Sequence, residues 1–188
     1  MISVTLGKMV SLCYNISIMK NYIVFDLEWN QSANGKERSI PHFPFEIIEI
    51  GAVKLNEAFQ MVDEFHRLIR PQVYTQMHHA ISEVTHMDMK ELRNSGELFP
   101  DAAADFLSWC GGDAVFCTWG NMDLLELQRN MDYYHMDNPF PKPLFYYDVQ
   151  KLYGLFCREN ARISLDSAVE EQSLLENRPF HRALDDAY

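Results

Sequence analysis

The chain has 188 residues, of which 47% are apolar and 13% aromatic, and its 16 basic against 27 acidic residues give a net charge of −11. This composition fits one domain with a sizeable core and excludes a disordered tail, a fibrous protein and a membrane-spanning chain, because no uncharged apolar run approaches the ~18 residues that a bilayer requires. The acidic balance also argues against a protein that holds nucleic acid by a broad cationic surface.

The chain begins with a segment that does not read as a secretion signal. Residues 1–20 (MISVTLGKMVSLCYNISIMK) are mildly apolar but lack a basic start, a long apolar stretch and a small-residue cleavage site. We interpret them as a leader ahead of a domain over residues 21–188, and a start at Met1, Met9 or Met19 is equally consistent with the sequence. The cysteines are widely spaced and form no C-x-x-C pair, which favours reduced thiols in a cytoplasmic protein; they are Cys13, Cys110, Cys117 and Cys157.

The first half of the chain predicts three strands and a helix. Residues 22–25, leading into Asp26-Leu27-Glu28, form a short β-branched and aromatic run that is typical of a buried strand. After a loop over residues 30–44, the segments 46–55 (EIIEIGAVKL) and 61–69 (MVDEFHRLI) indicate two strands joined by a turn. Residues 101–110 follow a proline with apolar residues at helical spacing and precede a glycine pair, which predicts a helix.

The second half of the chain alternates strands and helices. Strands are predicted at 114–119 and 144–147, and helices at 122–134, 148–160 and 164–175, the last opening on a serine that can cap it; residues 181–188 look like the beginning of a final helix. Between residues 83 and 137 eleven acidic residues face only three basic ones, which is typical of solvated helix faces. The element order predicts an α/β domain built on one mixed sheet.

Two carboxylates stand out in the first strand. Residues two apart on a strand share a face, so Asp26 and Glu28 point the same way from an otherwise apolar segment. Such a pair repels itself and is costly to desolvate. Each could be paired with a separate Arg or Lys, but the neighbouring predicted strands supply no central cation. A bound divalent cation is therefore the favoured interpretation.

Three further residues are candidates for the same site because of their positions in the predicted elements. Asp123 follows a strand and a Gly-Asn turn, which places it in the first turn of a helix, where an acid can also simply favour the helix dipole. Asp186 follows His181 by five residues, a spacing that does not share a helix face. Both can reach one site if His181 lies in the loop before the helix, although a lone histidine in such a place is often a surface residue.

Three motifs occur in order along the chain, namely FDLE at 25–28, WGNMD at 119–123 and HRALDDA at 181–187. They resemble the three exonuclease motifs of the DnaQ-like, DEDDh family of 3′→5′ exonucleases, and the segment 46–55 resembles the second strand of that family. Within the family, the chain is most similar to the branch of the histone-mRNA 3′ exonucleases, the Eri-type small-RNA exonucleases and bacterial KapD. The resemblance implies a ribonuclease H-like α/β fold, a five-stranded mixed sheet flanked by helices.

The resemblance also implies a set of site residues. Asp26, Glu28, Asp123 and Asp186 would be ligands of two Mg²⁺ ions, with Mn²⁺ as a substitute, and His181 would be the general base. The family's spacing from His to Asp selects Asp186 over the adjacent Asp185. In the family the last motif opens a helix that continues, so this helix is expected to be cut short after residue 188.

The implied activity is metal-dependent hydrolysis of single-stranded nucleic acid from its 3′ end, RNA favoured over DNA, with release of nucleoside 5′-monophosphates. Leu27 and Trp29 flank the acidic pair and could wedge or stack against the terminal bases, with core packing as the alternative for each. Lys36, Arg38 and Lys142 could touch phosphates, or be solvated loop charges. Two other functions stay open: a catalytically silent nucleic-acid-binding or interaction module with the same fold, and a hydrolase of small nucleotides on the same metal centre.

Overall fold

A computed structural model of the chain describes residues 20–35, 39–141, 144–157, 162–174 and 181–188. Nearly all of the expected leader, and the loop cations Lys36, Arg38 and Lys142, lie outside these residues.

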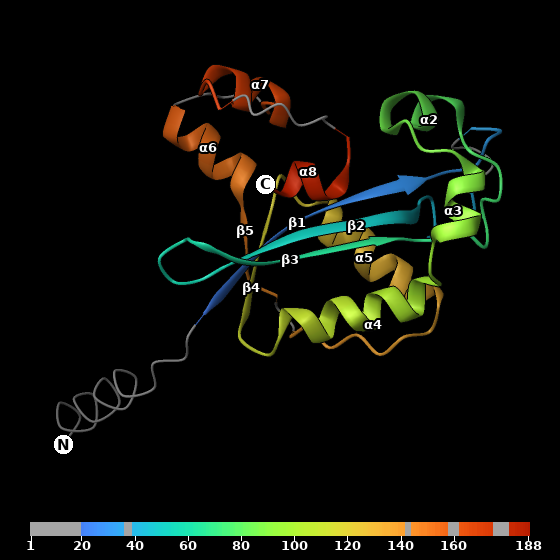
Figure 1. Cartoon of the computed structure of the whole chain (residues 1–188), viewed down its shortest axis with the longest axis horizontal. Coiled ribbons are helices and arrows are strands. Elements are labelled where there is room, and N and C mark those ends of the chain that lie inside the picture. The colour runs from blue at the N-terminus through green and yellow to red at the C-terminus, as the bar shows by residue number, and fades with distance from the viewer. Residues whose placement is uncertain (1–19, 36–38, 142–143, 158–161, 175–180) are drawn as a thin grey trace.

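The centre of the fold is a five-stranded mixed sheet, as predicted (Figure 1). Its strands are β1 (Asn21–Asn30), β2 (Glu46–Leu55), β3 (Met61–Leu68), β4 (Ala114–Thr118) and β5 (Tyr146–Asp148), in the order β3-β2-β1-β4-β5. The first three strands pair antiparallel, whereas β4 runs parallel to both β1 and β5. The end of β4 therefore lies beside the middle of β1, just before Asp26, and this is where the polar residues of the domain converge.

Seven helices are described around the sheet. They are α2 (His79–Thr85), α3 (Met89–Ser95), α4 (Phe99–Cys110), α5 (Met122–Tyr133), α6 (Val149–Cys157), α7 (Leu165–Glu171) and α8 (Ala183–Ala187). Figure 1 shows α4 and α5 on one side of the sheet and α6, α7 and α8 on the other. The sheet is therefore covered by helices on both faces.

The main hydrophobic core lies between the sheet and the helices α4 and α5. Ile23, Phe25 and Leu27 point from β1 into this core, where Phe106 of α4 and Leu127 of α5 pack against them, all nearly inaccessible to solvent. Because side chains alternate along a strand, this burial sends Asp26 and Glu28 to the opposite face, beneath α8. The apolar core thus fixes the direction of the two carboxylates.

The observed boundaries differ from the predicted ones by up to two residues in several elements. Strand β5 begins two residues later than predicted, and α4 begins two residues earlier because Pro100 is accommodated in its first turn. Ser164 does stand at the N-cap of α7, but its hydroxyl contacts that of Ser167 and makes no cap hydrogen bond. The helices α2 and α3 were not predicted at all.

Among the described residues, no helix has the length and apolar character that a membrane crossing requires.

Candidate active site

Strand β1 carries two carboxylates toward the face covered by α8. Asp26 and Glu28 are half-buried and lie opposite Gly51 and Glu49 of β2 in the antiparallel register. Residues directly opposite in such a pair share a face, so Glu28 and Glu49 are neighbouring like charges in the middle of the sheet. This arrangement is unfavourable unless a cation or a hydrogen-bond donor serves each group.

The turn after β4 supplies the third carboxylate. The Thr118 hydroxyl donates to the Gly120 carbonyl oxygen at 2.6 Å, and Gly120 adopts a left-handed backbone conformation (φ 100°) that favours glycine. This tight turn starts α5 at once, and Asp123 lies buried in its first turn. The backbone of Leu27 hydrogen-bonds the Asp123 carboxylate, which ties the start of α5 to β1 next to Asp26.

The last segment brings a histidine and a fourth carboxylate. His181 lies before α8 in a left-handed conformation (φ 66°), and its backbone N–H donates to Oδ2 of Asp186 at 3.0 Å. Potential ligand atoms of Glu28, His181 and Asp186 all lie within 4.8 Å of one another. The loop position of His181 therefore overcomes a spacing that a continuous helix would not allow, and Asp186, rather than Asp185, is the carboxylate in this group.

Burial and mutual repulsion raise the pKa values of the four carboxylates. Burial, with repulsion from Asp123 and Glu28, raises the pKa of Asp26 well above its usual range. Burial and the nearby Asp186 raise the pKa of Glu28 to about 8. Burial raises the pKa of Asp123 to about 7 and that of Asp186 to about 6, in each case against hydrogen bonds that lower it. The site concentrates negative charge that its own side chains do not neutralise.

This set of donors fits a divalent cation. Carboxylate oxygens are the preferred ligands of hard cations such as Mg²⁺ and Mn²⁺, and no described cysteine lies in the group. A cation placed among the four carboxylates would reverse the repulsion that raises their pKa values. The electrostatics and the ligand chemistry of the site therefore agree.

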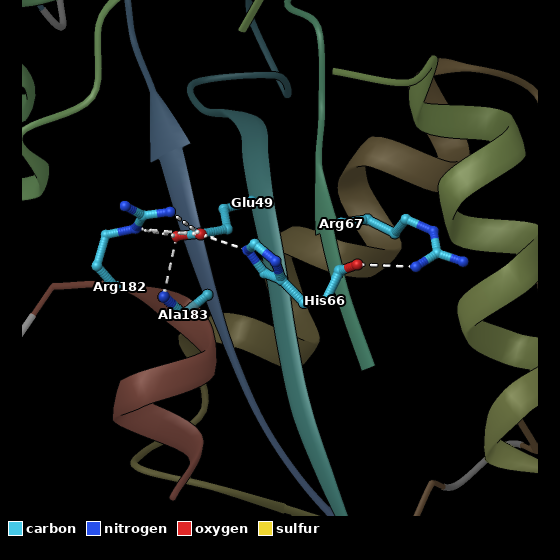
Figure 2. A network of polar contacts seen from close by, with 5 residues as sticks. All are labelled: Glu49, His66, Arg67, Arg182 and Ala183. Carbon is cyan, nitrogen blue, oxygen red and sulfur yellow. Dashed lines mark hydrogen bonds and ion pairs between the residues drawn. The ribbon is translucent and has the colours of Figure 1, made fainter. Parts of the chain in front are cut away.

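Glu49, the neighbour of Glu28, is already fully engaged by donors of the protein (Figure 2). It is 0% exposed, and its carboxylate accepts from His66 Nε2 at 2.7 Å, from Arg182 Nη2 at 2.8 Å and from the Ala183 N–H at 3.0 Å. Although burial alone would raise it, these hydrogen bonds hold the pKa of Glu49 below its usual range. Glu49 thus differs from Asp26, Glu28, Asp123 and Asp186, because hydrogen-bond donors of the protein offset its charge.

Sequence reasoning did not find Glu49 and Arg182. The available signals were a glutamate flanked by isoleucines in the segment EIIEIGAV and an arginine next to the candidate base His181. Neither signal identifies a partner, because the two residues are 133 positions apart.

Gly51 was also overlooked, although it permits the close approach of α8 to the sheet. A Cβ atom on Gly51 would lie 2.0 Å from the Leu184 nitrogen and 2.1 Å from the Ala183 carbonyl carbon. These are backbone atoms, which cannot move aside as a flexible side chain can. The absence of a side chain opposite Asp26 therefore lets α8 rest directly on β2.

A cleft of about 290 Å³ opens beside the carboxylates. Asp26 and Asp186 contribute to its wall, and the remaining lining is mainly apolar and includes the aromatic residues Trp119 and Tyr153. The cleft lies between the sheet and the helices α6, α7 and α8.

The two proposed stacking residues lie in different surroundings. Leu27 is 3% exposed and packs in the main core, on the opposite face of β1 from Asp26, so we assign its side chain to the core. Trp29 is half-buried after an irregularity in the β1–β2 register, and its ring lies 5.5 Å from that of Phe45.

Comparisons with known proteins give a consistent result. The model of the exonuclease family matches residues 23–188. The chain is 28% identical over 175 residues to a probable 3′-5′ exonuclease, KapD, of Bacillus subtilis, covering 88% of this chain and 78% of KapD. It is 33% identical over 144 residues to a PolC-type DNA polymerase III of Thermotoga petrophila, covering 76% of this chain but 10% of the polymerase. Its fold is shared with the nuclease domain of 3′hExo, described as a DEDDh family member, at a TM-score of 0.72 and 23% identity, over 91% of this chain and 88% of that domain.

Proposed function

Since this chain belongs to the exonuclease family, as a 3′→5′ exonuclease of the DEDDh type, we propose that it removes nucleotides from the 3′ end of single-stranded nucleic acid, with RNA favoured over DNA, and releases nucleoside 5′-monophosphates. The observation that carries this proposal is the convergence of Asp26, Glu28, Asp123, Asp186 and His181 from three distant segments of the chain. A group of carboxylates that are buried or half-buried and have raised pKa values has no evident structural use without a cation.

The four carboxylates hold Mg²⁺, two ions per site, with Mn²⁺ as the substitute. When bound, these ions offset the carboxylate charge and supply Lewis-acid stabilisation of a phosphate group. What supports this assignment is the all-oxygen ligand set together with the burial and the mutual repulsion that raise the pKa of Asp26. No other described group near Asp26 offers a comparable counter-charge, because Arg182 is committed to Glu49.

His181 acts as the general base. It takes a proton from the attacking water as the bond from oxygen to phosphorus forms, while the bond from phosphorus to the 3′ oxygen of the preceding nucleotide breaks. The products are a nucleoside 5′-monophosphate and a chain with a new 3′ hydroxyl. His181 is exposed and lies beside Glu28 and Asp186, which suits a base that must meet a solvent molecule.

The preference for RNA is supported by relatives. The 3′hExo domain is bound to rAMP, and another structure of this fold concerns recognition of the histone mRNA stem-loop by a 3′-exonuclease. Exonuclease I, which also shares the fold, is bound to a dT13 oligonucleotide, so the fold alone is compatible with both nucleic acids. In this chain, Trp29 and the cleft beside Asp26 are the features that we assign to contacts with the terminal nucleotides.

Residues 21–188 form the exonuclease domain in this proposal, with residues 1–20 as a leader. A cytoplasmic location is supported by the state of the described cysteines, since Cys110, Cys117 and Cys157 are all free thiols.

The test is a comparison of two labelled substrates. A 5′-labelled single-stranded RNA and its DNA twin are incubated with the protein and Mg²⁺, and with EDTA in place of Mg²⁺. We expect a ladder that shortens from the 3′ end, faster on RNA, and no cleavage in EDTA. An equal or faster rate on DNA would overturn the RNA preference. Binding without cleavage would favour the silent module, and hydrolysis of mononucleotide esters alone would favour a small-nucleotide hydrolase.

A further inference from the structure

We propose that Glu49 and Arg182 form a positioning pair that holds the segment from His181 to Asp186 over the acidic site, an inference that rests on the proposed function. Neither residue is among the carboxylates assigned to the cations. Both act on the reaction through the two residues that they place.

The geometry of Glu49 makes it an anchor rather than a ligand. Its side chain is fully buried in the centre of β2, and the donors around it come from β3 and from the last segment of the chain. Arg182 reaches it with two nitrogens, Nη2 at 2.8 Å and Nε at 3.2 Å, in the forked geometry that is specific to arginine. A residue held in this way fixes the direction of the chain that carries it.

Glu49 binds the last segment of the chain at a point between His181 and Asp186. Arg182 directly follows His181, and Ala183, whose N–H also donates to Glu49 at 3.0 Å, is the first residue of α8. Asp186 lies one helical turn further along. Fixing Arg182 and Ala183 on β2 therefore fixes both His181 and Asp186 relative to Glu28, the register partner of Glu49.

The segment needs such an anchor because α8 has little stability of its own. The helix has five residues, and its N-cap, Arg182, provides no side-chain cap. Helices of this length are not stable in isolation. Glu49 takes over the role of the cap from a neighbouring strand, since its carboxylate accepts the Ala183 N–H and places a negative charge at the start of the helix.

Chemical rescue tests this assignment. In Arg182→Ala, the guanidinium group that Glu49 requires is missing, and added guanidinium ion, far below denaturing concentrations, can occupy the vacated space because Arg182 is only half-buried. We expect the substitution to lower kcat by about 10- to 100-fold, as loss of an outer partner of a metal site usually does, with little change in KM for the oligonucleotide. Guanidinium should restore much of the lost kcat.

The controls separate positioning from general damage. Glu49→Gln should lower kcat in the same way but should not respond to guanidinium, and the double variant should be no worse than the worse single variant. Arg67→Ala is the matched control. Arg67 has a side chain of similar exposure that also pairs with carboxylates, Glu97 and Asp105, but it points away from the site toward α4 (Figure 2). Its contact with the network is a hydrogen bond from Nη1 to the backbone carbonyl oxygen of His66 at 2.8 Å, which does not involve the His66 ring that contacts Glu49. Arg67→Ala should leave kcat unchanged.

A second measurement does not depend on activity. In EDTA, hydrogen exchange of residues 181–188 should be faster in Arg182→Ala than in the natural protein, and guanidinium should slow it again, while Arg67→Ala should not differ. If both Arg182→Ala and Glu49→Gln had the kcat and the hydrogen exchange of the natural protein, the proposed positioning role would be overturned. A raised KM with unchanged kcat would instead make Arg182 a substrate contact. A natural protein without activity, but with the expected exchange pattern, would refute the proposed function and leave the anchor intact.

Discussion

Asp26 is the residue on which the other acids converge. Its pKa is raised by burial first and then by Asp123, Glu28 and Asp186, which come from all three motifs of the chain. A carboxylate in this position costs stability whenever the cation is absent, because the folded protein must hold it either protonated or repelled by its neighbours. Function and stability therefore oppose each other at this residue.

We expect Asp26→Asn to stabilise the metal-free protein. The amide has nearly the same shape but removes the buried charge, so at pH 8 in EDTA the free energy of unfolding should rise by at least about 1 kcal/mol, which shifts Tm by roughly 2–4 °C for a domain of this size. Thermal unfolding followed by circular dichroism measures the effect. Asp137→Asn, at an exposed loop position, is the control and should change little. A destabilised Asp26→Asn variant would contradict the electrostatic interpretation.

Two roles of His181, general base and metal ligand, predict different effects of its substitution. Its ring lies near enough to Glu28 and Asp186 to bind a cation with them. If it is the general base, His181→Ala should lower kcat by about 10²- to 10⁴-fold and leave the affinity for Mn²⁺, measured by titration calorimetry, close to that of the natural protein. A large loss of Mn²⁺ affinity would instead identify His181 as a ligand.

Among the elements, β2 organises the last segment through one missing side chain and one buried acid. Gly51 lets the backbone of α8 touch the strand, and Glu49 binds its first N–H. The site therefore depends on contact between a strand and a helix that are far apart in the sequence.

Gly51→Ala should displace α8 while leaving the main core folded. The new Cβ would collide with backbone atoms of Ala183 and Leu184 at 2.0 to 2.1 Å, so we expect a loss of about 1–3 kcal/mol in stability and of most of the activity. Hydrogen exchange should rise in residues 181–188 but not in β1. Gly112→Ala, where a Cβ meets nothing within 4 Å, should be neutral in both measurements. Full activity in Gly51→Ala would show that α8 need not contact β2.

The sequence predicted the long elements and the acidic site better than the short elements and their contacts. The bounds of β2 agree with the prediction, because isoleucine and other apolar residues dominate this ten-residue segment and the turn after it is clearly marked. Helices α2 and α3 have seven residues each and a single buried residue apiece, Thr85 and Leu92, so they show no helical periodicity. The partnership of Glu49 and Arg182 is a tertiary contact, which no local pattern encodes.

Across the whole molecule, the acidic balance has two different origins. In the stretch from residue 83 to 137 most acids are exposed on helix faces and in loops, as predicted, and the exceptions are the buried Asp123 and Glu126. Glu126 is paired with Arg129, whereas Asp123 faces the other carboxylates of the site. Of these two buried acids, only Asp123 requires a bound cation.

The stability of the whole protein should therefore depend on pH and on metal together. Carboxylates with raised pKa values bind protons more tightly in the folded protein, so in EDTA their contribution to stability is present below about pH 4 and is lost as the pH rises through the values of about 6, 7 and 8 at Asp186, Asp123 and Glu28. Mg²⁺ competes with these protons. The difference in Tm between Mg²⁺ and EDTA should therefore grow from pH 6 to pH 8, and a difference that is constant or shrinks would contradict the account.

The central claim is that four carboxylates and a histidine form a metal-dependent site that shortens nucleic acid from its 3′ end. The most direct measurement compares the natural protein with Asp26→Asn on one 5′-labelled single-stranded RNA in Mg²⁺. We expect a 3′ ladder from the natural protein and none from the folded variant, whose rate should fall by more than about 100-fold, beyond the usual effect of an outer residue. Equal ladders from both proteins, or cleavage inside the strand, would contradict the account.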